Sequence, residues 1–228
     1  MMSRHATNWA GNVTFRPEHL HRPTSIGELQ DVVARTHRAR ALGSGHSFNR
    51  IADTTGDLIG VDRLPSVIDI DREQMTVQVS AGTRYGELAA QLQRHGLALH
   101  NLGSLPQISV AGACATGTHG SGNTNPTLSS AVRSVRLVAA DGALTTLSRG
   151  DSGFGGAALS LGALGTVTSL VVDVRPTFDV EQYVYEGLSW DSLLTHFDNM
   201  MASGYSVSVF TDWRRPGQIW IKRLRRPV

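Results

Sequence analysis

The sequence predicts a mixed α+β fold built from two successive units. Helical and strand-like patterns alternate irregularly along the 228 residues, so the regular winding of a parallel α/β protein is not expected. Hydrophobic residues make up 40% of the chain, which is enough to form a buried core. The pattern changes after Pro176. We therefore expect a first unit over residues 1–178 and the beginning of a second, incomplete unit over residues 179–228.

The first helix is predicted to begin just after Ser25. The hydroxyl of Ser25 can accept a hydrogen bond from a free amide of the first turn, and Glu28 three residues later completes a capping box. Apolar residues then recur at helical spacing on one face. The strand that follows, Ala39–Leu42, is expected to end at Gly43.

Two further strands and a second helix come next. Strand-like patterns cover residues 57–61 and 75–79. The second helix is expected to be capped by Thr83, to present an apolar stripe and to stop at Gly96. Both helices therefore lie between strands, as in other α+β proteins.

A hairpin and a long strand complete the first unit. Residues 132–138 and 144–147 have the composition of strands, and Asp141 and Gly142 between them are a turn signal. Residues 167–174 are strongly β-branched, which predicts a further strand.

The second unit shows too few elements to be stable alone. A helix is expected around residues 190–201, followed by two paired strands at 205–210 and 218–221. No third strand is apparent that would cover this pair. Because an isolated two-stranded pair is only marginally stable, we interpret this unit as the start of a larger domain.

Charge and composition exclude several classes of protein. The net charge of +2 is too small for a general polyanion binder, and no basic stripe with aromatic residues is present, so no nucleic-acid partner is expected. No apolar run approaches the ~20 residues of a membrane span. Residues 1–5 show no signal segment, which predicts a cytoplasmic location. The single cysteine, Cys114, excludes a disulfide framework and a multi-cysteine zinc site.

Two histidines, His19 and His21, alternate in a segment that looks exposed. Such a pair can bind a metal ion adventitiously, but a solvated loop is the simpler interpretation. The sequence therefore predicts no metal site.

Three stretches rich in glycine and other small residues carry the functional signal. They cover residues 42–49, 103–122 and 162–168. Small residues let the backbone approach a bound group closely, and successive amides in tight turns bind anions. Flexible surface turns would explain one such stretch well but three poorly. We therefore expect a diphosphate held between these loops by amides and hydroxyls, without a lysine clamp.

These stretches resemble the flavin loops of FAD-linked oxidases in the vanillyl-alcohol oxidase superfamily. Gly43–Ser47 resembles their flavin-attachment loop, and Ser109–Gly122 is similar to their second pyrophosphate loop. Within the superfamily the chain most resembles the N-terminal half of bacterial alditol (xylitol) oxidases, and residues 8–12, 104–106, 115–122 and 210–213 also match. The resemblance implies a PCMH-type FAD-binding domain of two α/β subdomains, followed by the truncated start of a substrate domain.

The resemblance implies that FAD is attached covalently. In the family, the histidine at the position of His46 bonds through a ring nitrogen to the 8α-methyl group of the flavin. The attacking imidazole must be neutral, and an ordinary pKa of ~6.5 leaves it mostly neutral at physiological pH. Some relatives add a second, cysteine linkage. Leu105 occupies that place here, so a single linkage is expected.

The remaining FAD contacts are implied to come from the three stretches and the strand before the first. These residues are Ala41, Leu42, Gly43, Ser44, Gly45, Ser47, Ser104, Ser109, Gly112, Ala113, Cys114, Ala115, Thr116, Gly117, Gly165 and Thr166. Ser104 is also implied to contact the substrate. Taken by itself, Cys114 is more simply a small buried residue.

The implied reaction is oxidation of a CH–OH group of a sugar alcohol, such as xylitol or sorbitol, to an aldehyde. Oxygen is the implied acceptor and hydrogen peroxide the product. The family's polyol-binding and base-assisting residues lie in the second half of its chains, so no general base is assigned here. Two alternatives remain open: an aldonolactone oxidase of the arabinono- or gulono-1,4-lactone type, and a truncated non-catalytic FAD-binding module.

Overall fold

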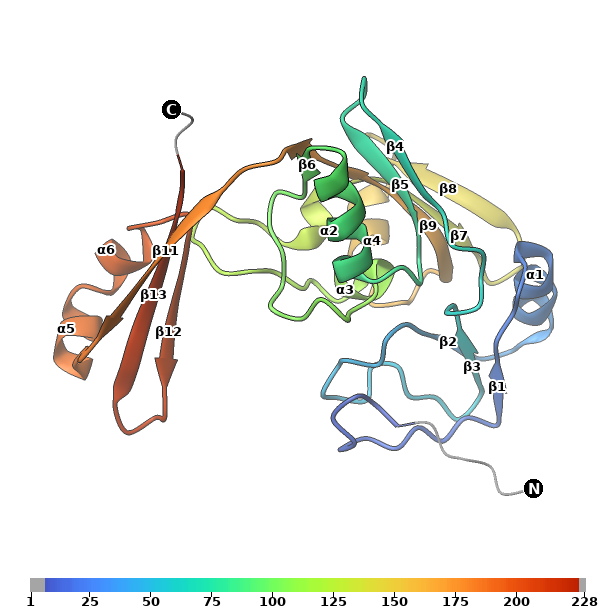
Figure 1. The fold of residues 1–228 in the computed structure, drawn as a ribbon. Coiled ribbons are helices and arrows are strands. Elements are labelled where there is room, and N and C mark those ends of the chain that lie inside the picture. Colours follow the sequence, from blue (N-terminus) through green and yellow to red (C-terminus); the bar gives the residue numbers. More distant parts are fainter. Residues whose placement is uncertain (1–6, 226–228) are drawn as a thin grey trace.

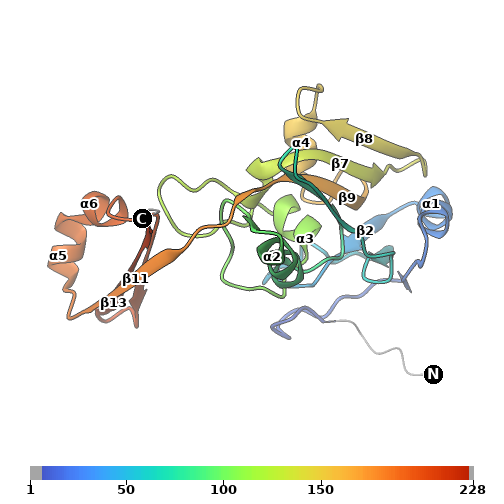
Figure 2. The same cartoon turned by 45° about the horizontal axis from the view of Figure 1, so that its top comes forward.

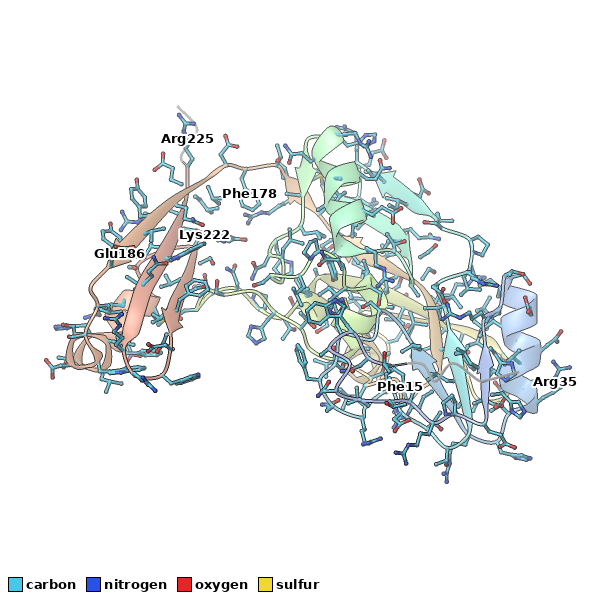
Figure 3. All side chains as sticks on the ribbon, turned by 60° about the horizontal axis from the view of Figure 1, so that its bottom comes forward. Phe15, Arg35, Phe178, Glu186, Lys222 and Arg225 are labelled. Carbon is cyan, nitrogen blue, oxygen red and sulfur yellow. The ribbon has the colours of Figure 1, made fainter. Side chains whose placement is uncertain are left out.

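The computed structural model describes residues 7–225, which form two bodies joined by an extended segment (Figure 1). The first body contains a five-stranded sheet, its helices and a smaller three-stranded sheet, and the second body is another three-stranded sheet with two short helices. Phe178 lies on the joining segment, whereas Glu186 and Lys222 lie on the second body (Figure 3). A domain boundary after residue 178 stays a prediction.

The five-stranded sheet forms the centre of the first body. Every neighbouring pair of strands in it is antiparallel. In spatial order the strands are β4 (Ile68–Asp71), β5 (Thr76–Ser80), β9 (Thr166–Asp173), β7 (Val132–Val138) and β8 (Leu144–Ser148). The strand predicted at 167–174 is thus the central one, and every second residue of β9 is buried, as expected for a strand with one face in the core.

Three helices lie beside this sheet: α2 (Tyr85–Arg94), α3 (Val110–Ala115) and α4 (Phe154–Ala158) (Figures 1 and 2). Leu88 of α2 and Val110 of α3 are fully buried, and they belong to one continuous core with Val79 and Val135 of the sheet. A short 3-10 helix, η1 (Leu128–Ala131), precedes β7, and β6 (Leu97–Ala98) pairs with β10 (Arg175–Pro176). This packing fixes α3 against the sheet.

A small parallel sheet flanks the core in the order β1, β3, β2. Its strands are β1 (His19–His21), β3 (Asp57–Gly60) and β2 (Ala39–Leu42), and α1 (Ile26–Arg35) connects β1 to β2. The chain leaves the end of β2 directly into the first glycine-rich stretch. The small sheet therefore positions that loop relative to α3.

The predicted cap of α1 is confirmed with one difference. The hydroxyl of Ser25 accepts a hydrogen bond from the amide of Glu28 at 3.1 Å. The Glu28 carboxylate reaches back to the amide of Thr24 rather than to that of Ser25, at 2.7 Å. This hydrogen bond from the Thr24 amide is the main cause that lowers the pKa of Glu28 below its usual value.

The predicted cap of α2 is wrong. The helix begins at Tyr85, its N-cap is Arg84, and no side chain caps it. Thr83 is held outside the helix because its amide donates to the carbonyl of Ser80 and its carbonyl accepts from the amide of Val110. The stop at Gly96 is confirmed, since this residue follows the C-cap with a φ of 69°.

The second body differs from the expectation in two respects. The predicted pair is present as β12 (Ser206–Thr211) and β13 (Pro216–Leu224), but a third strand, β11 (Val180–Glu186), pairs with the other edge of β13. All residues of β11 are exposed, so no buried apolar pattern marks it in the sequence. The predicted helix over 190–201 is split into α5 (Trp190–Thr195) and α6 (Phe197–Met201), because His196 leaves the helical conformation.

The second body is hydrogen-bonded to the long loops of the first. The hydroxyl of Tyr205 donates to the carbonyl of His100 at 2.6 Å, and the side-chain amide of Asn125 donates to the carbonyl of Tyr205 at 2.7 Å. The hydroxyls of Ser121 and Ser206 are also hydrogen-bonded to each other. These contacts join β12 and the residue before it to the stretch that contains residues 103–122.

Within residues 7–225, no helix combines the length and the apolar character needed to cross a membrane. The expectation that the chain lacks a signal segment rests on residues 1–5, which lie outside the described residues.

The hairpin turn between β7 and β8 requires glycine at position 142. Gly142 has a φ of 81°, and a Cβ there would lie 2.8 Å from the Cβ of Ala34 on α1. We expect Gly142→Ala to destabilise the protein by about 1–3 kcal/mol, measured by chemical denaturation. The matched control is Gly27→Ala at an exposed position of α1, where a Cβ meets no atom within 4 Å. It should be neutral or stabilise by up to about 1 kcal/mol. Equal denaturation midpoints for the two variants would contradict the role of the turn.

Candidate functional site

One cavity brings the three glycine-rich stretches together. Its volume is about 390 Å³, within the range of ~300–1,000 Å³ typical of sites for small molecules and cofactors. Residues from the end of β2 and the loop after it form one wall, α3 and the loop before it form another, and residues 160–167 close the far side. The site therefore lies between the small parallel sheet and the large antiparallel sheet.

The first two stretches touch at Ser109. A Cβ built on Gly43 would lie 2.5 Å from the hydroxyl oxygen of Ser109, and one on Gly112 would lie 2.7 Å from it. The amide of Ser109 donates to the hydroxyl of Ser44 at 3.1 Å. A side chain at position 43 or 112 would force the Ser109 hydroxyl to shift, and glycine at both positions leaves room for that hydroxyl between the two loops.

An N-terminal loop, residues 8–13, holds the outer side of the first stretch. The side-chain amide of Asn8 donates to the carbonyl of Ser47 at 3.0 Å, and the amide of Trp9 donates to the carbonyl of Gly45 at 2.8 Å. Asn8 is buried, and its side-chain oxygen accepts from the amide of Val13. These hydrogen bonds fix the backbone on both sides of His46.

The imidazole of His46 stacks on the indole of Trp9. The ring centroids are 4.9 Å apart and the planes meet at 24°. Burial, and then the positive charge of Arg84, lower the pKa of His46 below its ordinary value, so the ring is neutral at physiological pH. Its Nδ1 atom is shielded from solvent and has no hydrogen-bond partner among the described residues. This site thus presents a neutral imidazole with a free ring nitrogen.

Most residues predicted from the sequence line this cavity. They are Ala41, Leu42, Gly43, Ser44, Gly45, His46, Ser47, Ser104, Ser109, Gly112, Ala113, Ala115, Thr116 and Gly165. Cys114, Gly117 and Thr166 are not among the lining residues. The predicted set is therefore brought together in space, although its members come from three distant parts of the chain.

Cys114 points into the core behind α3. Its sulfur lies 3.4 Å from the hydroxyl of Tyr85, and burial raises its pKa to about 11. The thiol is therefore protonated at physiological pH and unreactive. This placement agrees with the simpler interpretation of Cys114 as a small buried residue.

Several lining residues were not predicted. They include Phe15, Arg40, Phe48, Ile108, His119, Ser160 and Leu161. Arg40 is the one arginine or lysine among the lining residues, and its guanidinium donates to the carbonyl of Leu161 at 3.1 Å. Phe48, Ile108 and His119 lie within the glycine-rich stretches but were not assigned a contact, because the pattern marks small residues. The others lie outside those stretches, Arg40 on β2 and the rest in irregular segments, so no glycine pattern marks them.

Comparison with models of known protein families shows which family the chain belongs to. The FAD-binding domain family matches residues 17–148, which is more than half of the chain. The chain belongs to the FAD-binding domain family. This match supports FAD as the group that the cavity holds.

Two curated relatives of this FAD-binding domain are similar over most of the chain. Alditol oxidase from Streptomyces sp. is 51% identical over 97% of this chain and 54% of its own length. L-gulono-1,4-lactone dehydrogenase from Mycobacterium tuberculosis is 40% identical over 78% of this chain and 42% of its own. The chain thus spans about half the length of the curated relatives it matches.

A solved structure confirms the fold. Cholesterol oxidase from Brevibacterium sterolicum matches with a TM-score of 0.83 at 17% sequence identity, over 98% of this chain and 48% of that chain. The likeness agrees with the predicted α+β architecture of an FAD-binding domain.

The chemistry of the residues that line the cavity also fits FAD, independently of the comparisons. Two of its polar atoms, Nδ1 of His46 and the hydroxyl oxygen of Ser109, are buried without a partner among the described residues. Buried polar groups are almost always hydrogen-bonded, so such atoms point to a ligand that completes their bonding. Gly43, Gly45 and Gly112 line the cavity without side chains of their own, which suits binding of a diphosphate by main-chain groups.

The stacking of Trp9 on His46 makes the indole a reporter of the imidazole charge. A protonated imidazole in contact quenches indole emission, so the fluorescence of the flavin-free protein should fall as the pH drops. Because burial and Arg84 lower the pKa of His46, the midpoint should lie below ~6.5. Arg84→Gln should move the midpoint upward, since it removes a positive charge. The step should vanish in Trp9→Phe, and a step that persists there would come from another tryptophan.

Proposed function

We propose that this chain is the flavin-binding part of an FAD-dependent oxidase that converts a CH–OH group of a sugar alcohol to an aldehyde. The supporting observation is the site itself: a glycine-lined cavity with a neutral imidazole whose Nδ1 atom is shielded from solvent, in a chain 51% identical to a named alditol oxidase. Bound FAD supplies acceptance of the hydride and return of the electrons to oxygen, which yields hydrogen peroxide. The partners of the reaction are accordingly a polyol and oxygen.

The diphosphate of FAD is held mainly by backbone and hydroxyl groups. Ser44, Gly45 and Ser47 supply one side, and Ser109 and Thr116 supply the other. Gly165 lies toward the adenosine end with Thr166 behind it. Arg40 adds one positive charge at the wall. These groups suit a buried diphosphate because amides and hydroxyls are neutral. Removing them from water costs less free energy than removing charged side chains.

His46 carries the flavin through a single covalent bond from a ring nitrogen. The lowered pKa keeps the ring in its nucleophilic, neutral form. Stacking on Trp9 and the clamp by Asn8 limit the rotation of the ring and of its loop. Leu105 also lines the cavity and offers no second nucleophile.

Ser104 is the residue that we propose contacts the substrate. It lines the cavity and is exposed. An exposed hydroxyl on the cavity wall can hydrogen-bond a polyol. We assign no general base to this chain.

Covalent attachment is tested by acid precipitation followed by gel fluorescence. In the native chain the flavin band should stay with the polypeptide, and in His46→Ala it should be lost completely. His119→Ala is the matched control, because His119 also lines the cavity but is not proposed to bond the flavin. A band that survives in His46→Ala would place the attachment at another residue and overturn the assignment.

An aldonolactone oxidase is the second candidate, favoured by the 40% identity to a lactone dehydrogenase. Release of peroxide should be measured with xylitol and with an aldono-1,4-lactone. We expect turnover with xylitol at least ten times that with the lactone. The reverse ratio would establish the lactone activity instead, and a yellow protein inert with both would be a non-catalytic FAD-binding module.

A further inference from the structure

Three side chains of metal-ligating type meet on the small parallel sheet, and none of them lines the flavin cavity. His19 and His21 belong to β1, the strand at one edge, and Asp57 begins the neighbouring strand β3. Residues two apart on a strand point to the same side, and His19 is directly opposite Asp57 in the strand register. The segment is thus a paired strand rather than the solvated loop expected from the sequence.

The distances between these groups suit a bound cation. Nδ1 of His19 lies 2.9 Å from one carboxylate oxygen of Asp57, and Nε2 of His21 lies 3.6 Å from the other. One ligand atom from each of the three residues lies within 4.8 Å of the others. Ligands of a tetrahedral zinc ion are about 3.4 Å apart, given Zn–N and Zn–O distances near 2.1 Å. Small side-chain rotations would therefore complete the geometry.

The nitrogen of His21 gives a second observation that points to a ligand. Nε2 of His21 is shielded from solvent and has no hydrogen-bond partner among the described residues. A buried polar atom without a partner costs free energy. Coordination of a cation by the lone pair of Nε2 would remove that cost, whereas a simple histidine–carboxylate pair leaves His21 at 3.6 Å from Asp57.

The carboxylate of Asp57 is also held in place from outside the cluster. The hydroxyl of Thr36, the C-cap residue of α1, donates to Oδ2 of Asp57 at 2.9 Å. Such outer hydrogen bonds orient the ligands of metal sites and increase their affinity. The carboxylate therefore has one oxygen anchored by the protein and presents its charge to both histidines.

We propose that His19, His21 and Asp57 form a binding site for a divalent transition-metal ion such as Zn²⁺. Two imidazoles and one carboxylate are ligands of this class of ion, whereas Ca²⁺ and Mg²⁺ prefer sites made of oxygen atoms. Three protein ligands leave a position for water. The proposal does not depend on the flavin chemistry proposed above.

The bound ion would stabilise the sheet that carries the flavin loop. It joins the edge strand β1 to the central strand β3, which also pairs with β2. Because β2 runs directly into Gly43–Ser47, occupancy of the metal site should stiffen the base of that loop. Heat stability should therefore rise with free Zn²⁺ and level off once the site is filled.

The test is calorimetric titration of the flavin-loaded chain with Zn²⁺ alone, repeated with variants. We expect one ion per chain with a dissociation constant in the micromolar range or below. His21→Ala and Asp57→Asn should each weaken binding at least tenfold and abolish the Zn²⁺-dependent rise in melting temperature. His19→Ala removes the most exposed ligand and is therefore the variant least able to disturb the fold. Its flavin content should equal that of the native chain, so that weaker Zn²⁺ binding in this variant is not due to misfolding.

His95→Ala is the matched control, because His95 is exposed and lies outside the cluster. It should bind Zn²⁺ as the native chain does. Equal affinity in the native chain and in His21→Ala would overturn the proposal, as would a native dissociation constant above about 100 µM. An equal loss in His95→Ala would show adventitious surface binding only.

Discussion

The meeting of two backbone segments at the hydroxyl of Ser109 is the contact on which the rest of the site depends. Gly43 follows strand β2 of one sheet and Gly112 lies in the short helix packed on the other, and a Cβ at either position would force the Ser109 hydroxyl to shift. The amide of Ser109 also donates to the hydroxyl of Ser44, so Ser109 joins the two walls of the cavity. This close pair of walls lets main-chain groups, rather than charged side chains, face a bound diphosphate.

The N-terminal loop, residues 8–13, also restrains the loop that carries His46. Asn8 is buried and its side chain links two backbone segments separated by more than 30 residues, while Trp9 covers one face of His46. A loop rich in glycine would otherwise sample many conformations, and a covalent bond needs one. These contacts of Asn8 and Trp9 restrict the loop before any cofactor is present. The loop therefore loses its conformational entropy during folding of the chain and not during cofactor binding.

The sequence predicted this arrangement where local chemistry decided it and failed where distant contacts did. The cap of α1, the turn at Gly142 and the central strand β9 follow from neighbouring residues, and the three glycine-rich stretches do line one cavity. Thr83 was misjudged because hydrogen bonds to Ser80 and Val110 hold it outside the helix. Strand β11 carries no buried face, so only its pairing with β13 reveals it. Asp57 could not be linked to His19 and His21 without the parallel register of β1 and β3.

The hydrogen bonds of Tyr205 connect the two bodies through a particular piece of chain. Its hydroxyl holds the carbonyl of His100 and its own carbonyl is held by Asn125, so it grips both ends of the segment that includes Ser104 and His119. The segment that contributes Ser104 and His119 to the cavity is therefore joined to the second body on both sides, before it at His100 and after it at Asn125. The walls of the flavin site are thus shared, through hydrogen bonds, with the part of the chain that follows the FAD-binding domain.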